Sequence, residues 1–465
     1  MRASFVAIAD NSTVRTDNVR RPRWTRRSVL AHIGAAAAML QVPLSFAQPA
    51  RRHFSVKDFH AMGDGITIDT APIQRAIDAA YSIGGGVVWI GPGRYVTGTL
   101  LLKSGVTLEF AQDATFLGST DPTDYRLLEP FVDAVGAARG YALIGCVDAH
   151  NVGIAGPGII DGRGAMLQAP GGTGPSAKPF LLLCLRSTAV SIEGISLVNS
   201  SAWTMHVFQC SDVTISHIRI RSLGLANNDG IDIDSSQRVH VEGCTIETGD
   251  DAICLKTTSS KPCKDITVKS CTMTTRCAAF KIGTESAGDF SGIRVSDCHV
   301  VEANLGAIKI LSVDGANIHD VLVERIQVDD ADTPIFLRLG ARGRTFRPGD
   351  VARLPGTLSN VVIRDMDVKH ARRIGILISG IPGHVIENVT LEQITITMSG
   401  ELETQLPPQP AENPAAYPEV RMFGGNLPAF GIYGRHLRGL RMRQVAISGI
   451  AGDTRPERLL SDDRP

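Results

Sequence analysis

The sequence has no long uninterrupted apolar run and no excess of basic charge. The mildly apolar, Ala-rich stretch after residue 30 is short and is interrupted by Pro43, whereas a membrane-spanning helix needs about 20 consecutive apolar residues. Residues 1–47 hold seven Arg, no Lys and two Asp, so the remainder has 47 − 7 = 40 basic and 47 − 2 = 45 acidic side chains, a net charge of −5. A nucleic-acid partner would favour a basic face. We therefore expect neither a membrane nor a nucleic acid as partner.

Aromatic residues are also scarce, at 5% of the chain, while glycine is common, with 47 residues. This composition is typical of a chain with many short strands and tight turns. The nine cysteines are an odd number, so at least one thiol is free. Neither the disulfide pairing nor the oligomeric state follows from the sequence.

Residues 1–47 have the layout of a twin-arginine signal peptide. Residues 25–30 read Thr-Arg-Arg-Ser-Val-Leu, and small residues precede Gln48. The alternative is an ordinary basic amphipathic tail. We expect a protein that is periplasmic or secreted by the twin-arginine route. Because this route exports folded chains, the cysteines need not form disulfides.

The rest of the chain, 48–465, repeats one pattern: apolar-x-apolar-x-x-apolar-x-apolar. Alternation at period two indicates half-buried strands, and the two-residue break indicates a turn between them. Stacked coils bury the apolar sides that no single coil can bury. We predict an all-β fold, one right-handed parallel β-helix. The first six repeats, with starts 23, 26, 27, 27 and 28 residues apart, begin at Val190, Val213, Val239, Ile266, Ile293 and Val321, and three more begin at Val361, Val389 and Leu440.

Three further features support this fold. Cys244, Cys271 and Cys298 occupy one repeat position, 27 residues apart, and we interpret them as a core ladder instead of a metal site. Residues 69–86 combine an N-cap, helical apolar spacing and terminal glycines, which predicts a helix that caps the first coil. Residues 400–418 carry five prolines among polar residues and indicate a loop or flexible insertion.

The stretch 227–257 places several acids within this strand-like sequence. Residues one repeat apart become neighbours at about 4.8 Å in a solenoid. Aligning the apolar pairs Ile231/Ile233 and Ile253/Leu255 puts Asp229 in register with Asp251. Asp250 is one residue out of phase, so its carboxylate leaves the coil at another angle. Three carboxylates then gather on one face of two consecutive coils.

Close carboxylates raise each other's pKa, so such a group tends to hold one proton near neutral pH. Glycoside hydrolysis with inversion requires a protonated acid and an ionised carboxylate that activates water. The alternatives are calcium binding or solvated turn acids. We predict a catalytic set with a carbohydrate substrate and with no metal or cofactor.

The same register points Asp232, Cys254, Lys281 and Lys309 outward from successive coils, with Lys256 one step along. A lysine row beside carboxylates could hold an acidic sugar or orient the acids. The alternative, strongest for Lys256, is a solvated strand with ladder salt bridges.

These features together resemble glycoside hydrolase family 28, the polygalacturonases and their relatives, over most of the mature chain. The segments FSVKDFHAMGDGITIDT and GPGIIDGRG are similar to such pectin-active proteins. The family's Asn-Thr-Asp-Gly motif stands here as residues 227–230, and its Gly-Asp-Asp as residues 249–251. The resemblance implies that Asp250 is the general acid and that Asp229 and Asp251 hold the nucleophilic water.

Two departures stand out. The family's Gly-His-Gly reads Cys277-Ala278-Ala279 here, so the histidine is missing. Its Arg-Ile-Lys reads Ala307-Ile308-Lys309, so the arginine is missing. Our hypothesis is that Lys281 supplies the lost positive charge. Further predicted substrate contacts are Glu285, Arg435, His436, His206 and Trp203. For Trp203, a packed core aromatic is an equally weighted alternative.

Two other classes remain open. A polysaccharide lyase on the same fold would use a metal-neutralised carboxylate, and a non-catalytic glycan-binding β-helix would fit the two losses. The leading prediction is an inverting hydrolase of pectin-type or other uronic-acid-containing glycans. Its specificity is expected to lie in loops such as 125–140 and 340–356, to which the repeat does not extend.

Overall fold

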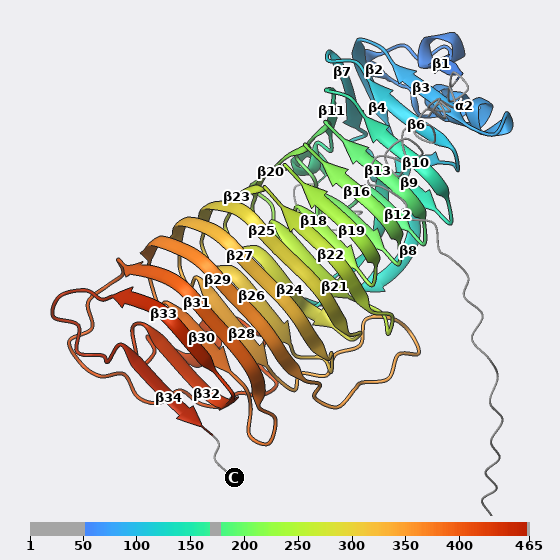
Figure 1. The fold of residues 1–465 in the computed structure, drawn as a ribbon. Helices are drawn as coiled ribbons and strands as arrows, with labels where there is room; N and C mark the ends of the chain where they lie inside the picture. The colour runs from blue at the N-terminus through green and yellow to red at the C-terminus, as the bar shows by residue number, and fades with distance from the viewer. Residues whose placement is uncertain (1–51, 168–177, 463–465) are drawn as a thin grey trace, which may run out of the picture. The chain divides into compact units, whose positions relative to one another are not determined.

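The computed structural model describes residues 52–167 and 178–462, so the predicted signal peptide lies outside the described residues. The described chain winds through stacked strands that pair in parallel with the coils before and after them, as Figure 1 shows. Only β8 (Arg126–Val132) among the named strands pairs antiparallel, with β9. The predicted right-handed parallel β-helix is confirmed.

One stack carries the candidate site. Its strands are β5 (Leu100–Leu102), β9 (Ala138–Val147), β12 (Phe180–Leu185), β15 (Met205–Phe208), β18 (Ile231–Asp234), β21 (Ile253–Thr257), β24 (Ala278–Ser286), β26 (Gly306–Ser312), β28 (Ile335–Leu339), β30 (Ile376–Ser379), β32 (Ile432–Arg438) and β34 (Arg458–Asp462).

Two further stacks complete each coil. The second holds β1 (His53–Ser55), β3 (Gly86–Ile90), β6 (Val106–Phe110), β10 (His150–Ala155), β13 (Thr188–Glu193), β16 (Ser211–Ser216), β19 (Gln237–Glu242) and β22 (Cys263–Lys269). The third holds β2 (Asp64–Ile68), β4 (Gly93–Thr97), β7 (Ala114–Gly118), β11 (Ile159–Asp161), β14 (Ser196–Val198), β17 (Arg219–Ser222), β20 (Thr245–Thr248) and β23 (Thr272–Thr275).

From the coil after β23 onward the second and third stacks continue as single long strands. These are β25 (Phe290–Ala303), β27 (Ile318–Ala331), β29 (Leu358–Ala371), β31 (Ile386–Met398) and β33 (Arg441–Ser448). The predicted turn at the two-residue break is therefore a bend in these coils. One residue at the bend adopts a positive φ, 57° at Asp297 and 54° at Arg325, which redirects the strand without ending it.

The repeat register is as predicted. Val190 pairs with Val213, Val213 with Val239, and Val239 with Ile266, each pair one coil apart. Because every coil places the same apolar positions inward, one continuous core runs through the solenoid.

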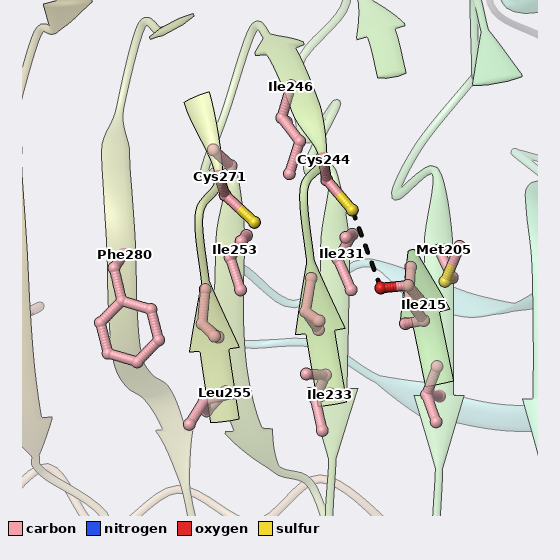
Figure 2. Packing of buried hydrophobic residues seen from close by; sticks show 14 of the residues in the cluster. Met205, Ile215, Ile231, Ile233, Cys244, Ile246, Ile253, Leu255, Cys271 and Phe280 are labelled. Carbon is pink, nitrogen blue, oxygen red and sulfur yellow. Dashed lines mark hydrogen bonds between the residues drawn. The ribbon is translucent and has the colours of Figure 1, made fainter. Parts of the chain in front are cut away.

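The cysteine ladder lies in this core, as Figure 2 shows for Cys244 and Cys271. Cys244, Cys271 and Cys298 are all buried, and all nine cysteines of the chain are free thiols. The structure thus confirms their predicted role as core residues.

The predicted capping helix is α2 (Thr70–Ser82), whose buried face packs against the first coils. Asp69 precedes it, but its carboxylate accepts hydrogen bonds from the backbone N–H groups of Met62 and Gly63 instead of capping the helix. Short 3-10 turns complete the helical elements: η1 (Val56–Phe59), η2 (Pro122–Asp124), η3 (Gly164–Leu167) and η4 (Val420–Phe423). Within the described ranges no helix is long and apolar enough to cross a lipid bilayer.

The Pro-rich segment 400–418 contains neither helix nor strand, as predicted for a loop. Two buried arginines hold it against the solenoid. Arg338 donates to the carbonyl oxygens of Glu412 and Asn413 at 3.1 Å each, and Arg435 donates to those of Pro410 and Ala411 at 2.8 and 2.9 Å.

Candidate active site

The candidate aspartates stand on the turns that precede β18 and β21. Ile231 pairs with Ile253, and the N–H of Gly230 donates to the carbonyl oxygen of Asp251 at 2.8 Å. Asp229 therefore lies one coil from Asp251, in the predicted register.

All three carboxylates line one cavity, which opens to solvent. Asp229 and Asp251 are buried, and Asp250 is half-buried. The hydroxyls of Thr248 and Thr275 donate to the backbone carbonyl oxygen of Asp250, at 2.7 and 2.5 Å. These two hydrogen bonds fix the backbone of Asp250, which is one residue out of phase with Asp251 and Asp229. The three aspartates line one cavity, so their predicted convergence on one face is confirmed.

Lys281 neutralises Asp251. The two lie on consecutive coils because Cys254 pairs with Lys281, and the Lys281 Nζ lies 2.7 Å from Asp251 Oδ2 with both side chains buried. Burial alone would raise the pKa of Asp251, but the charges of Lys281 and Lys256 lower it to about 2. Asp251 is therefore ionised throughout the physiological range.

Lys256 lies among three other acids. Its Nζ is 3.2 Å from Glu285, 3.3 Å from Asp232 and 3.4 Å from Asp229, and 4.3 Å from the centre of the Trp203 ring. One cation cannot neutralise three carboxylates. Burial first, and then the charges of Glu285 and Asp251, raise the pKa of Asp232 to about 8 in spite of Lys256. Burial and Asp232 likewise raise the pKa of Asp229.

Asp250 differs electrostatically from Asp251. Burial and the adjacent Asp251 carboxylate raise the pKa of Asp250 above its usual value. Lys281 opposes this shift only partly. The cavity thus places a carboxyl whose pKa is raised next to one that is ionised, the kind of pair that acid–base cleavage of a glycosidic bond uses.

Several predicted site residues do not line the cavity. Lys309 pairs in register with Lys281, as predicted, but it is fully buried and its Nζ binds Glu419 at 2.5 Å. Asp232 is buried beneath Lys256. His206 is buried and its Nε2 lies 3.0 Å from Asp234.

Arg435 and His436, the two predicted substrate contacts near the C-terminus, bind the Pro-rich segment instead. Arg435 is buried and donates to backbone carbonyls of that segment, and the His436 Nε2 lies 3.1 Å from Glu412. Trp203 stacks on Phe180 with ring centroids 5.4 Å apart. The Lys256 ammonium lies over the Trp203 ring, and Trp203 is among the residues that line the cavity.

The cavity also has lining residues that the repeat did not reveal. Asp133, Ala134 and Val135 come from the loop between β8 and β9, Thr284 from β24, and Tyr417 from the Pro-rich segment. The sequence indicated only that segments 125–140 and 400–418, which supply most of these residues, lie outside the repeat. The predicted residues Lys256, Lys281 and Glu285 do line the cavity.

One group of side chains could hold a metal ion. An oxygen of Asp250, an oxygen of Asp251 and the Cys277 sulfur lie within 4.8 Å of one another. A mixed oxygen and sulfur set suits Zn²⁺ better than Ca²⁺ or Mg²⁺. A metal there would occupy two of the three candidate catalytic carboxylates, so it would compete with proton transfer.

Comparison with known proteins agrees with this geometry. The sequence profile of the Glycosyl hydrolases family 28 matches residues 97–412, and that of the Rhamnogalacturonase A/epimerase, pectate lyase-like group matches residues 53–120. A "Probable polygalacturonase" of Vitis vinifera is 26% identical over 369 residues, which cover 75% of this chain and 74% of that protein.

Solved structures share the fold. A hyperthermoactive exopolygalacturonase from Thermotoga maritima superposes with a TM-score of 0.64 at 20% identity, over 84% of this chain and 92% of that one. The family 28 exopolygalacturonase of Yersinia enterocolitica gives 0.67 at 18% identity, over 89% and 77%. The family match spans 412 − 97 + 1 = 316 of 465 residues, more than half of the chain. The protein therefore belongs to glycoside hydrolase family 28, the polygalacturonase-type glycosidases.

Proposed function

We propose that the protein hydrolyses a glycosidic bond in pectin-type or other uronic-acid-containing glycans with inversion at the anomeric carbon. One observation carries this proposal: a single cavity holds Asp251, ionised by its contact with Lys281, beside Asp250, whose pKa is raised. Inversion requires one carboxyl as proton donor and another as the base for water, typically about 6.5–9.5 Å apart. Oxygens of Asp250 and Asp251 come within 4.8 Å of each other, so the inverting outcome is taken from the family resemblance and not from this separation.

In the proposed reaction Asp250 donates its proton to the glycosidic oxygen as the bond to the anomeric carbon breaks. Asp251 accepts a proton from the attacking water, whose oxygen becomes the new anomeric hydroxyl. Asp229 lies one coil away from Asp251 and is the other residue predicted to hold the water. It forms a further hydrogen bond to that water. Lys256, Lys281 and Glu285 line the same cavity, where sugar hydroxyls would lie.

We also propose that the enzyme attacks chain ends. The cavity is walled by Ala134 on one side and Tyr417 on another, from segments about 280 residues apart. Both walls are fixed: Ala134 N–H donates to Glu285 at 2.9 Å, Arg344 donates to the Ala134 carbonyl, and the hydroxyls of Tyr417 and Thr284 lie 3.3 Å apart. A walled pocket admits a terminal residue more readily than the middle of a polymer. The relatives that are named exopolygalacturonases support this mode.

We also propose that the protein acts outside the cytoplasm, because residues 1–47 have the layout expected of a twin-arginine leader. Sequencing the N-terminus of protein recovered from the periplasm or medium tests this: we expect a start near Gln48. An intact Met1 on an active cytoplasmic protein would contradict it.

The catalytic proposal is tested by incubating the purified protein with a panel of pectic oligosaccharides. We expect new reducing ends, with the inverted anomer appearing first by NMR, and no release by Asp250→Asn. A retained anomer would exclude inversion. A product with ultraviolet absorption that depends on added metal would indicate a lyase, and binding without turnover would indicate a glycan-binding protein.

A further inference from the structure

Both cations that line the cavity, among the described residues, are already paired with an acid of the protein. Arg344, whose guanidinium donates to the Ala134 carbonyl, is exposed and does not itself line the cavity. Lys281 pairs with Asp251 at 2.7 Å, and Lys256 has Glu285 at 3.2 Å together with two further aspartates. Neither lysine therefore has an uncompensated charge to offer to a ligand.

Two cations behind the wall, Arg139 and Arg342, are paired with acids in the same way. Arg139, behind the 133–135 loop, pairs with Asp133 at 2.7 Å. Arg342 stacks over Tyr417, with 5.8 Å between the guanidinium carbon and the ring centre, and pairs with Asp314 at 2.5 Å. Both ion pairs are buried.

Lys309 is the most informative of these cations. It lies in register one coil beyond Lys281, where the row of lysines could meet an acidic sugar. The protein's own Glu419, two residues from the cavity-lining Tyr417, occupies its Nζ, and the Lys309 side chain is fully buried. An internal carboxylate thus binds the cation that a substrate carboxylate would need.

A carboxylate brought into this cavity would find both lining lysines already bound to acids of the protein, with no unpaired ammonium to receive it. A buried charge without a counter-charge is strongly disfavoured, whereas hydroxyl and ester oxygens can be hydrogen-bonded without that penalty. Specificity of this kind comes from repulsion of the wrong ligand as well as from attraction of the right one.

We propose that the sugar residue held in the cavity carries no free carboxylate, and that Glu419 sets this preference by neutralising Lys309. This inference rests on the proposed glycosidase function and narrows it. The ligand that this cavity would accept is an uncharged sugar residue at the cleaved end of a pectic chain. It has two sources: a neutral sugar, or a uronic residue whose carboxyl is esterified.

The test compares three oligosaccharides with one linkage and one length. Their terminal residue is galacturonic acid, its methyl ester, or the C6-reduced neutral sugar. We expect kcat/KM of the unmodified enzyme to favour one or both uncharged forms over the free acid by at least about tenfold. Hydrolysis of the ester or of the neutral form identifies the source.

Glu419→Gln removes the internal competitor and should raise kcat/KM on the free acid by about tenfold. Glu401→Gln, an exposed acid of the same Pro-rich segment, is the matched control and should change nothing. Equal or better turnover of the free acid by the unmodified enzyme overturns this inference and leaves the proposed function intact. Failure to cleave any of the three, or the wider panel, overturns the proposed function instead. The comparison of substrates needs no variant, so it decides even if Glu419→Gln does not fold.

Discussion

Lys281 and Asp251 are 30 residues apart in the chain, yet the ammonium and a carboxylate oxygen are 2.7 Å apart and buried together. The distance follows from the coil length: Cys254 and Lys281 pair across neighbouring strands, so the lysine extends over the turn that carries Asp251. This contact makes one of three neighbouring aspartates the ionised one, and it separates the roles of acid and base.

Lys281→Ala should shift the pH–rate profile to higher pH. The Lys281 charge lowers the pKa of Asp251, to about 2, and partly offsets the raised pKa of Asp250. Removing it raises both pKa values, so activity that needs ionised Asp251 is lost at a higher pH on the acidic side. The alkaline limb, which reports loss of the Asp250 proton, moves up as well.

The expected shift of the acidic limb is about one to three pH units, measured as kcat/KM against pH. Lys264→Ala, which changes a partly exposed lysine in the adjacent stack, is the control and should leave the profile in place. An unmoved acidic limb in a folded Lys281→Ala protein would show that Asp251 is not the base.

Arg344→Ala should loosen the wall at residues 133–135. The arginine donates to the Ala134 carbonyl and so ties the 340–356 loop to the cavity wall. On a long polymer the unmodified enzyme should release small products from the start, and the variant should also release larger fragments, as chromatography of early products would show. Arg353→Ala, from the same loop but bound to Ala287 and Asp289, should behave like the unmodified enzyme. If Arg344→Ala released the same product sizes as Arg353→Ala and the unmodified enzyme, the result would contradict a role of the wall in chain-end attack.

The thiol count should depend on folding. All nine cysteines are free and buried, so a thiol reagent should detect about nine groups in denaturant and almost none in the native protein within minutes. A reductant should leave the melting temperature unchanged, because no disulfide contributes to stability. A fall of several degrees on reduction would indicate that the exported protein forms a disulfide.

Chelator should leave turnover unchanged, because the proposed chemistry uses carboxylates and water alone. Added Zn²⁺ should inhibit, since Asp250, Asp251 and Cys277 lie close enough to share it. Cys277→Ser should weaken that inhibition, whereas Cys298→Ser, in the core ladder, should not. Loss of activity on chelation, restored by metal, would instead support the lyase alternative.

Much of this site could be predicted from local sequence because a solenoid converts sequence spacing into spatial neighbourhood. The register of Asp229 with Asp251, of Lys281 with Lys309, and of the cysteine ladder needed only the repeat length. The capping helix followed from ordinary helix signals.

The cavity walls could not be predicted in this way. Ala134 and Tyr417 lie on segments outside the repeat, so no spacing rule places them. The repeat pattern also could not predict where a side chain in the register ends. Lys281 and Lys309 share one register, but only Lys281 lines the cavity. Glu419, from the Pro-rich segment, binds Lys309 instead. That contact depends on a tertiary partner 110 residues away.

The central claim is that Asp229, Asp250 and Asp251 act as one catalytic unit, and a mutant cycle on kcat tests it most directly. Asp250→Asn should lower kcat by at least about 100-fold, and Asp265→Asn, an exposed aspartate of the adjacent coil face, should not lower it. Because the three act together, the double variant Asp250→Asn/Asp251→Asn should be little worse than the poorer single variant. Near-normal kcat in a folded Asp250→Asn protein, or losses that multiply in the double variant, would contradict the account.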